Sequence, residues 1–167
     1  MKVGDLYSRL GRGLQPNRFQ VTITGAPGAF SDLKFLCKGT VLPASNLGEV
    51  AIPHMGRIYK VPCDRTFEDV QLTVLNDENG IIRRAFEGWQ KSFNDYMDNQ
   101  GDGEFQFGEC KIEQLTQVTG KPSPMTYNLK DVWPGEISAV EMDWGNNDTI
   151  QEFSVTLKYQ RLEIDNV

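Results

Sequence analysis

The clearest structural signal in the sequence is the stretch Val70-Gln71-Leu72-Thr73-Val74, in which apolar and polar side chains alternate. Such alternation is typical of a strand that buries one face. The stretch Asn76-Asp77-Glu78-Asn79 follows and supplies several helix-capping side chains. After it, apolar residues recur at helical spacing and predict one amphipathic helix over residues 79–95: Ile82, Ala85, Phe86, Trp89 and Phe93.

Alternating patterns on both sides of this unit predict further short strands. The predicted strands are 19–24, 33–37, 110–118, 125–132, one near 137–144, and 153–159. Residues 43–62 are interrupted by prolines and glycines and predict a long loop around a short strand at 58–61. A turn is predicted at 120–124. The pattern favours one mainly β domain over residues 1–167, with a locally basic N-terminal arm at 1–16.

Composition excludes several classes of protein. The 167 residues carry a net charge of −6, and tight DNA binding needs a basic surface instead. No apolar run is long enough for a membrane-spanning helix, and the first residues lack the apolar core of a signal peptide. Negative charge is concentrated around residues 96–108, which we term the acidic loop.

Residues suited to catalysis or metal binding are scarce. Cys37, Cys63 and Cys110 are widely spaced, and we expect all three to be reduced and buried in a protein folded in the cytoplasm. His54 is the single histidine, so neither a catalytic triad nor a zinc site is predicted. The acids around Asp102 do not follow the order of a calcium loop. We therefore predict no enzymatic activity, no metal and no cofactor, and expect the aromatic rings of Trp89, Trp133 and Trp144 to pack in the core or on a sheet.

Four motifs together resemble the tail tube proteins of contractile-tail (myovirus) bacteriophages, which are related to the type VI secretion tube protein. The motifs are Asp64-Arg65-Thr66-Phe67-Glu68-Asp69 leading into the strand at 70–75, Phe86-x-x-Trp89-Gln90, Leu129-Lys130-Asp131-Val132-Trp133-Pro134, and Ile150-Gln151-Glu152-Phe153-Ser154-Val155-Thr156-Leu157. The resemblance extends from about Asn17 to Tyr159. The acidic loop departs from the family pattern and is predicted to be an insertion on the outside.

The resemblance implies a fold and an assembly. The expected fold has two packed antiparallel sheets, forming a partly barrel-like sandwich with one flanking α-helix and long loops. Six copies would form a ring, and rings would stack into the inner tail tube, the conduit for genome ejection. The implied partners are further copies of the chain and the sheath, baseplate, tape-measure and tail terminator proteins. DNA would pass without specific binding, and the protein would reside in the virion tail after assembly in the host cytoplasm.

Two sets of residues are candidates for contacts in such an assembly. Long loops in compact domains are usually functional, so His54, Met55, Arg57 and Tyr59 are predicted to touch the adjacent subunit or ring; a loop packed on its own subunit is the alternative. Glu141 and Asp143 are predicted to share a strand face and to contribute acids to the lumen. A ring of six copies would carry a net charge of about −36, and the resulting negative potential would keep DNA from adhering.

Two other functions fit the same sequence features. One is the tube protein of a non-viral contractile injection or type VI secretion system, which would carry a protein effector. The other is a monomeric β-sandwich that acts as a hydrolase or ligand-binding module.

Overall fold

The computed structural model describes residues 3–10, 13–101, 103–116 and 125–165. The predicted turn at 120–124 and Asp102 of the acidic loop lie outside the described residues. In chain order the elements are α1 (Val3–Leu10), β1 (Phe19–Thr24), α2 (Leu33–Leu36), β2 (Cys37–Thr40), β3 (Ser45–His54), β4 (Arg57–Phe67), β5 (Val70–Leu75), α3 (Ile81–Phe93), β6 (Gly108–Gln114), β7 (Met125–Ile137), β8 (Glu152–Lys158) and β9 (Arg161–Asp165).

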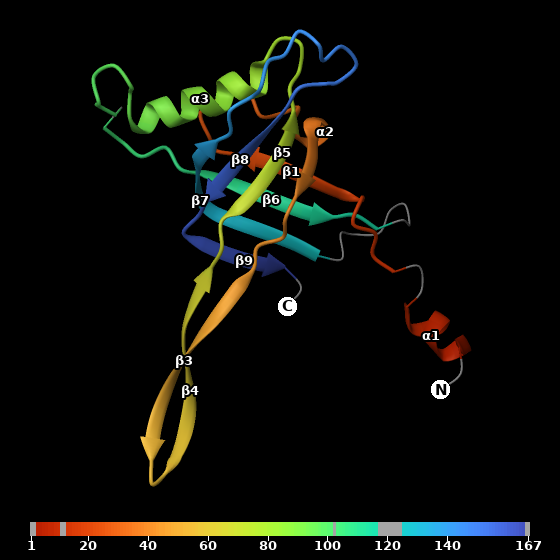
Figure 1. Ribbon diagram of the computed structural model, residues 1–167, viewed down its shortest axis with the longest axis vertical. Coiled ribbons are helices and arrows are strands. Elements are labelled where there is room, and N and C mark those ends of the chain that lie inside the picture. Colours follow the sequence, from red (N-terminus) through yellow and green to blue (C-terminus); the bar gives the residue numbers. More distant parts are fainter. Residues whose placement is uncertain (1–2, 11–12, 102, 117–124, 166–167) are drawn as a thin grey trace.

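The body of the molecule is built from antiparallel strands in the order β1-β6-β7-β8-β5-β2, with β9 paired to β7 (Figure 1). The long strand β7 joins two sheets, because its first part pairs with β6 and β9 and its last part pairs with β8. The register of β7 on β8 shifts between Pro134 and Glu136. The mainly β fold class predicted from the sequence is confirmed, whereas the strands do not close into a barrel within the described chain.

The core lies between the two sheets and α3. The buried faces of β1, β5, β6 and β8 supply alternate apolar residues, as in β5, where Val70, Leu72 and Val74 are inaccessible. From α3, the ring of Trp89 is fully buried, and its indole Nε1–H donates a hydrogen bond of 2.8 Å to the carbonyl of Gln106. The carboxylate of Asp77 accepts a hydrogen bond of 2.9 Å from the amide of Ile81, where α3 begins.

The prediction of a long loop at 43–62 is wrong, because this stretch belongs to the β3–β4 hairpin (Figure 1). Its two strands pair antiparallel through most of their length, and Met55-Gly56 forms the turn with φ of 46° and 77°. Two positive φ values are those of a type I′ turn, which Asn-Gly signals more clearly than Met-Gly. Pro53 and Pro62 also lower the strand signal, but prolines are tolerated in strands that have an open edge.

Three further expectations differ from the structure. Residues 33–36 form the short helix α2, so the predicted strand begins only at Cys37; α1 and α2 also bring the described helices to three rather than one. Residues 138–151 form no strand. Cys63 and Trp144 are exposed, Trp144 completely, although both were expected to be buried or packed. In the described chain, no helix has the length and apolar character needed to cross a membrane.

Candidate assembly surfaces

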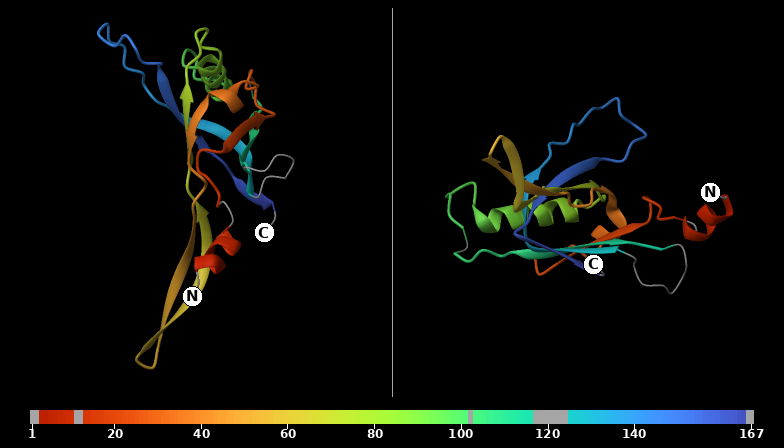
Figure 2. Two further views of the ribbon diagram at one scale, coloured as in Figure 1. Left: turned by 90° about the vertical axis from the view of Figure 1, so that its right-hand side faces the viewer. Right: turned by 90° about the horizontal axis from the view of Figure 1, so that it is seen from below.

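The β3–β4 hairpin projects from one end of the molecule, along its longest axis (Figures 1 and 2). The structure brings the four predicted contact residues together at its far end. His54 and Arg57 are direct cross-strand partners, Tyr59 pairs with Ile52, and Met55 occupies the turn. His54, Arg57 and Tyr59 share one face of the hairpin, since successive side chains of a strand alternate in direction.

The hairpin exposes large apolar side chains along its length. Met55 is 92% exposed, Tyr59 70% and Ile58 69%, and the smaller side chains of Val50 and Ile52 are about half exposed. An isolated two-stranded hairpin is at best marginally stable in water. Apolar exposure of this extent is typical of surfaces that another molecule covers.

At its base, the hairpin is attached to the body by polar and aromatic contacts. The hydroxyl of Tyr159 donates a 3.0 Å hydrogen bond to the carbonyl of Glu68, and the amide of Asn46 donates one of 3.1 Å to the Glu68 carboxylate. The rings of Phe67 and Tyr159 lie 6.2 Å apart. These contacts fix where the hairpin leaves the body.

The loop between β7 and β8, residues 138–151, projects beyond the opposite end of the body (Figure 2). We call it the β7–β8 loop. Glu141 and Asp143 lie in it and are exposed, so the premise that they share a strand face is wrong. The same loop exposes Met142 at 84%, Trp144 at 102% and, near its end, Ile150 at 69%.

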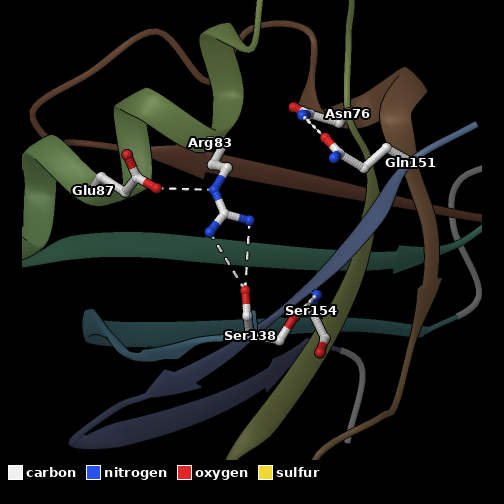
Figure 3. A network of polar contacts seen from close by, with 6 residues as sticks. All are labelled: Asn76, Arg83, Glu87, Ser138, Gln151 and Ser154. Carbon is white, nitrogen blue, oxygen red and sulfur yellow. Dashed lines mark hydrogen bonds and ion pairs between the residues drawn. The ribbon is translucent and has the colours of Figure 1, made fainter. Parts of the chain in front are cut away.

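A network of hydrogen bonds holds the base of the β7–β8 loop (Figure 3). Ser138 and Ser154 close the base, because the Ser138 amide donates to the Ser154 carbonyl and the Ser154 amide donates to the Ser138 hydroxyl, at 2.8 and 2.9 Å. From α3, the guanidinium of Arg83 donates to the carbonyl of Ser138 at 3.5 Å and pairs with Glu87 at 2.8 Å.

The other end of the loop is attached to the start of the β5–α3 connection. The Asn76 amide nitrogen donates to the Gln151 side-chain oxygen at 2.5 Å, and the backbone amide of Asn76 donates to the Gln151 carbonyl at 2.9 Å. Farther out, the Asp143 carboxylate accepts a 3.0 Å hydrogen bond from the Gly145 amide, which forms a local turn beside Trp144. The loop is therefore exposed but anchored at both ends.

The acidic loop supplies two rings, Phe105 and Phe107, to an aromatic cluster with Phe93 of α3 and Trp133 of β7. Phe93, Phe105, Phe107 and Trp133 form a chain of ring contacts with centroids 5.6 to 6.2 Å apart. The amide of Met97 donates a hydrogen bond to Asp95, which lowers the pKa of that carboxyl. No group of three or more metal-ligating side chains occurs in the residues that the structure describes.

Sequence patterns identified part of these surfaces. The four residues predicted to touch another subunit or ring, His54, Met55, Arg57 and Tyr59, lie exposed at the tip of a hairpin rather than on a loop, and the contact itself stays a prediction. The sequence pattern does not predict the exposed apolar residues of the β7–β8 loop, because it places Met142 on a strand and Trp144 in the core or on a sheet. The available signal was the turn-forming run Gly145-Asn146-Asn147-Asp148 directly after Trp144.

Comparison with known sequences gives consistent matches. Residues 14–165 match the family model described as phage tail tube protein. The tail tube protein gp19 of Enterobacteria phage T4 is 32% identical over 144 residues, covering 86% of each chain. The tail tube protein of Serratia phage KSP90 is 28% identical over 159 residues, covering 91% of this chain and 89% of its own.

Solved structures share the fold at low sequence identity. A chain of the PVC sheath–tube complex, an extracellular contractile injection system in its extended state, superposes with a TM-score of 0.66 at 15% identity, covering 100% of this chain and 99% of its own. A type six secretion system protein gives a TM-score of 0.52 at 13% identity, with 87% and 81% covered.

Proposed function

This chain belongs to the phage tail tube protein family, as a structural component of the virion tail, and we propose that it assembles as hexameric rings stacked into the inner tube of a contractile tail. The observation that carries this proposal is a hairpin that exposes several large apolar side chains on a body that already has its own core. A sheath around the tube and a baseplate beneath it are the partners of this assembly. The role is structural, without catalysis.

Within a ring, we propose that neighbouring subunits pair their sheet edges. In the described chain, β1 pairs with β6 and β2 pairs with β5, which leaves the other edge of each strand unpaired. Unpaired edges are templates for pairing with another chain, and closure into a ring of sheets removes them. An open sheet supports this proposal better than a barrel-like subunit would, because an open sheet keeps the unpaired edges of β1 and β2 that a neighbouring subunit can pair with.

The lumen surface in this proposal is the solvated face of the sheet formed by β1, β6, β7 and β9. One face of these strands is buried and apolar, whereas the other carries Gln20, Thr22, Lys111, Glu113, Asn128 and Lys130. Lysines on this face are paired with acids, with Lys111 at 2.8 Å from Glu113 and Lys130 at 2.7 Å from Glu109. Such pairing leaves few free cations to hold a passing DNA phosphate. Glu141 and Asp143 are not assigned to the lumen, since they lie in the β7–β8 loop.

Contacts between stacked rings come from the hairpin tip. The test is a chain in which residues 48–64 are replaced by Asn-Gly. This turn joins Leu47 to Arg65, which are cross-strand partners, so the shortened hairpin keeps its register. The anchoring contacts of Asn46, Phe67 and Tyr159 remain. We expect the shortened-hairpin chain to fold but to form no tubes at protein concentrations at which the parent chain assembles.

A matched pair of tyrosine variants separates the tip from general loss of surface aromatics. Tyr59→Ala removes a 70% exposed ring at the tip, and Tyr96→Ala removes an 83% exposed ring near the end of α3. We expect Tyr59→Ala to raise the concentration needed for tube formation at least about tenfold, and Tyr96→Ala to leave it unchanged. Negative-stain microscopy and sedimentation measure both. Intact tubes from the shortened-hairpin chain would contradict the proposal.

The phage tail is favoured over a non-viral injection system by sequence similarity. The relatives at 28–32% identity are phage tail tube proteins, whereas the injection-system structures share the fold at 15% or less in the comparisons given above. A monomeric hydrolase or ligand-binding module is not supported by either comparison.

A further inference from the structure

We propose that the β7–β8 loop is the receiving site for the hairpin tip of a second copy of this chain in the next ring. The contact joins Met55, Arg57 and Tyr59 of one subunit to Glu141, Met142 and Trp144 of the other. This inference rests on the proposed stacking of rings and goes beyond it by naming the surface that receives the hairpin.

The first support is position. The hairpin and the β7–β8 loop project from opposite ends of the body along its longest axis (Figures 1 and 2). When identical subunits stack in the same orientation, the lower end of one meets the upper end of the next. Such head-to-tail contact is heterologous and continues without limit, which is what a tube needs.

The second support is apolar complementarity. Each surface exposes large apolar side chains that its own subunit leaves uncovered: Met55, Tyr59 and its cross-strand partner Ile52 on the tip, and Met142, Trp144 and Ile150 on the loop. Aromatic and methionine side chains are enriched at the centres of protein interfaces. Trp144 is more exposed than any other large apolar side chain in the described residues, and tryptophan is among the residues most often found as interface anchors.

The third support is charge. Residues 138–151 contain Glu141, Asp143 and Asp148 but no lysine or arginine. At the tip, Arg57 has no ion-pair partner within the described residues, whereas Lys60 is already paired with Glu49 at 2.6 Å. A cationic tip and an anionic loop attract each other and disfavour tip-to-tip or loop-to-loop contact.

The fourth support is that the loop is preorganised. Its base is held by Arg83, Ser138 and Ser154 on one side and by Asn76 and Gln151 on the other (Figure 3). The turn at Asp143 fixes the backbone next to Trp144. A flexible loop loses conformational entropy when it binds a partner, and a loop that is already anchored loses less.

The test is a disulfide cross-link between subunits. In a Cys63→Ser background, which removes the exposed native thiol, Met55→Cys is combined with Gly145→Cys, at the exposed position next to Trp144, so that the rings of Tyr59 and Trp144 stay in place. Mild oxidation at high protein concentration is expected to give a ladder of covalent multimers on non-reducing gels, because each chain carries one tip and one loop. Met55→Cys with Tyr96→Cys is the control of similar exposure and should give no ladder, and Met55→Cys alone should give dimers at most.

A second variant measures necessity. We expect Trp144→Ala to fold normally and to raise the concentration needed for tube formation at least about tenfold, whereas Tyr96→Ala should not. Absence of the ladder, or normal assembly of Trp144→Ala, overturns the docking site. If the shortened-hairpin chain still fails to assemble in that case, the proposed stacking through the hairpin survives without this receiver. If the shortened-hairpin chain assembles, both proposals fail.

Discussion

The hairpin and the body of this molecule are both β structure, but they are stabilised in different ways. In the body, alternate residues of β1, β5, β6 and β8 are buried, and two sheets and α3 share one apolar core. In the hairpin, both faces of both strands are exposed, with Val61 the sole partly buried position. Backbone pairing is complete enough in the hairpin to define its register, but its side chains gain little from it.

This difference indicates a division of labour. A body with its own core folds as a monomer, which a building block must do before assembly. In the proposed tube, the exposed apolar side chains of the hairpin are buried by another subunit. The stability of the subunit and the stability of the tube should therefore depend on different residues.

Thiol labelling should show the largest contrast between the two regions. Cys63 on β4 is exposed, whereas burial raises the pKa of Cys110 in β6 to about 12 and that of Cys37 to about 11. At pH 8 the buried Cys110 and the partly buried Cys37 both remain thiols, and Cys110 reacts only when the core opens. In the unassembled subunit we expect Cys110 to react at least about a thousandfold more slowly than Cys63.

Labelling with a chromogenic disulfide reagent measures these rates. Cys63→Ser should remove the fast phase and leave the others unchanged. Reaction of Cys37 should accelerate as the pH rises toward about 11, because its thiolate becomes populated there. Equal rates for Cys63 and Cys110 would show that the body has no more protection than the hairpin.

Substitution of Trp89 and Met55 should separate the two regions in free energy of unfolding. Trp89→Ala removes a fully buried ring and is expected to cost about 3–5 kcal/mol. Met55→Asn places a residue favoured in type I′ turns at a positive φ and should change stability by less than about 0.5 kcal/mol. It also removes the exposed thioether, so tube formation should weaken while folding does not.

Urea denaturation followed by circular dichroism measures both free energies. If Trp89→Ala does not give soluble protein, Ile82→Val at another inaccessible position of α3 should cost about 0.5–1.5 kcal/mol. A large loss of stability in Met55→Asn would indicate that the tip packs within its own subunit, the alternative open from the sequence.

The body could be predicted from the sequence because its residues report local burial. Val70, Leu72 and Val74 alternate because one face of β5 meets the core, and α3 occupies 81–93 within the predicted 79–95 for the same reason. The hairpin could not be predicted in this way. Neither of its faces is buried in the subunit, so its sequence does not have to alternate between apolar and polar residues. Its turn also lacks the usual Asn-Gly.

The sequence pattern predicts a strand near 137–144, where the β7–β8 loop begins, for a related reason. Ile137, Val140 and Met142 suggest a strand when apolar residues are assumed to be buried, yet Met142 and Trp144 are exposed. The contacts that hold the loop, from Arg83 to Ser138 and from Asn76 to Gln151, join residues far apart in the sequence and leave no local pattern. From one sequence alone, exposed apolar residues suited to an interface cannot be distinguished from apolar residues of the core.

The ion pairs provide the smallest contrast between the two regions. Lys60 and Glu49 on the hairpin lie 2.6 Å apart, but their side chains are 63% and 58% exposed, so Lys60→Ala should change subunit stability by less than about 0.5 kcal/mol. Arg83 in the body is 27% exposed and donates to Ser138 as well as pairing with Glu87, so Arg83→Ala should cost about 1 kcal/mol. Denaturation at low and high salt measures both, and salt should reduce only the hairpin pair's contribution appreciably. If Lys60→Ala lowers the free energy of unfolding as much as Arg83→Ala does, the free subunit already shields the hairpin from water. That result would contradict the proposal that another copy of the chain covers the hairpin.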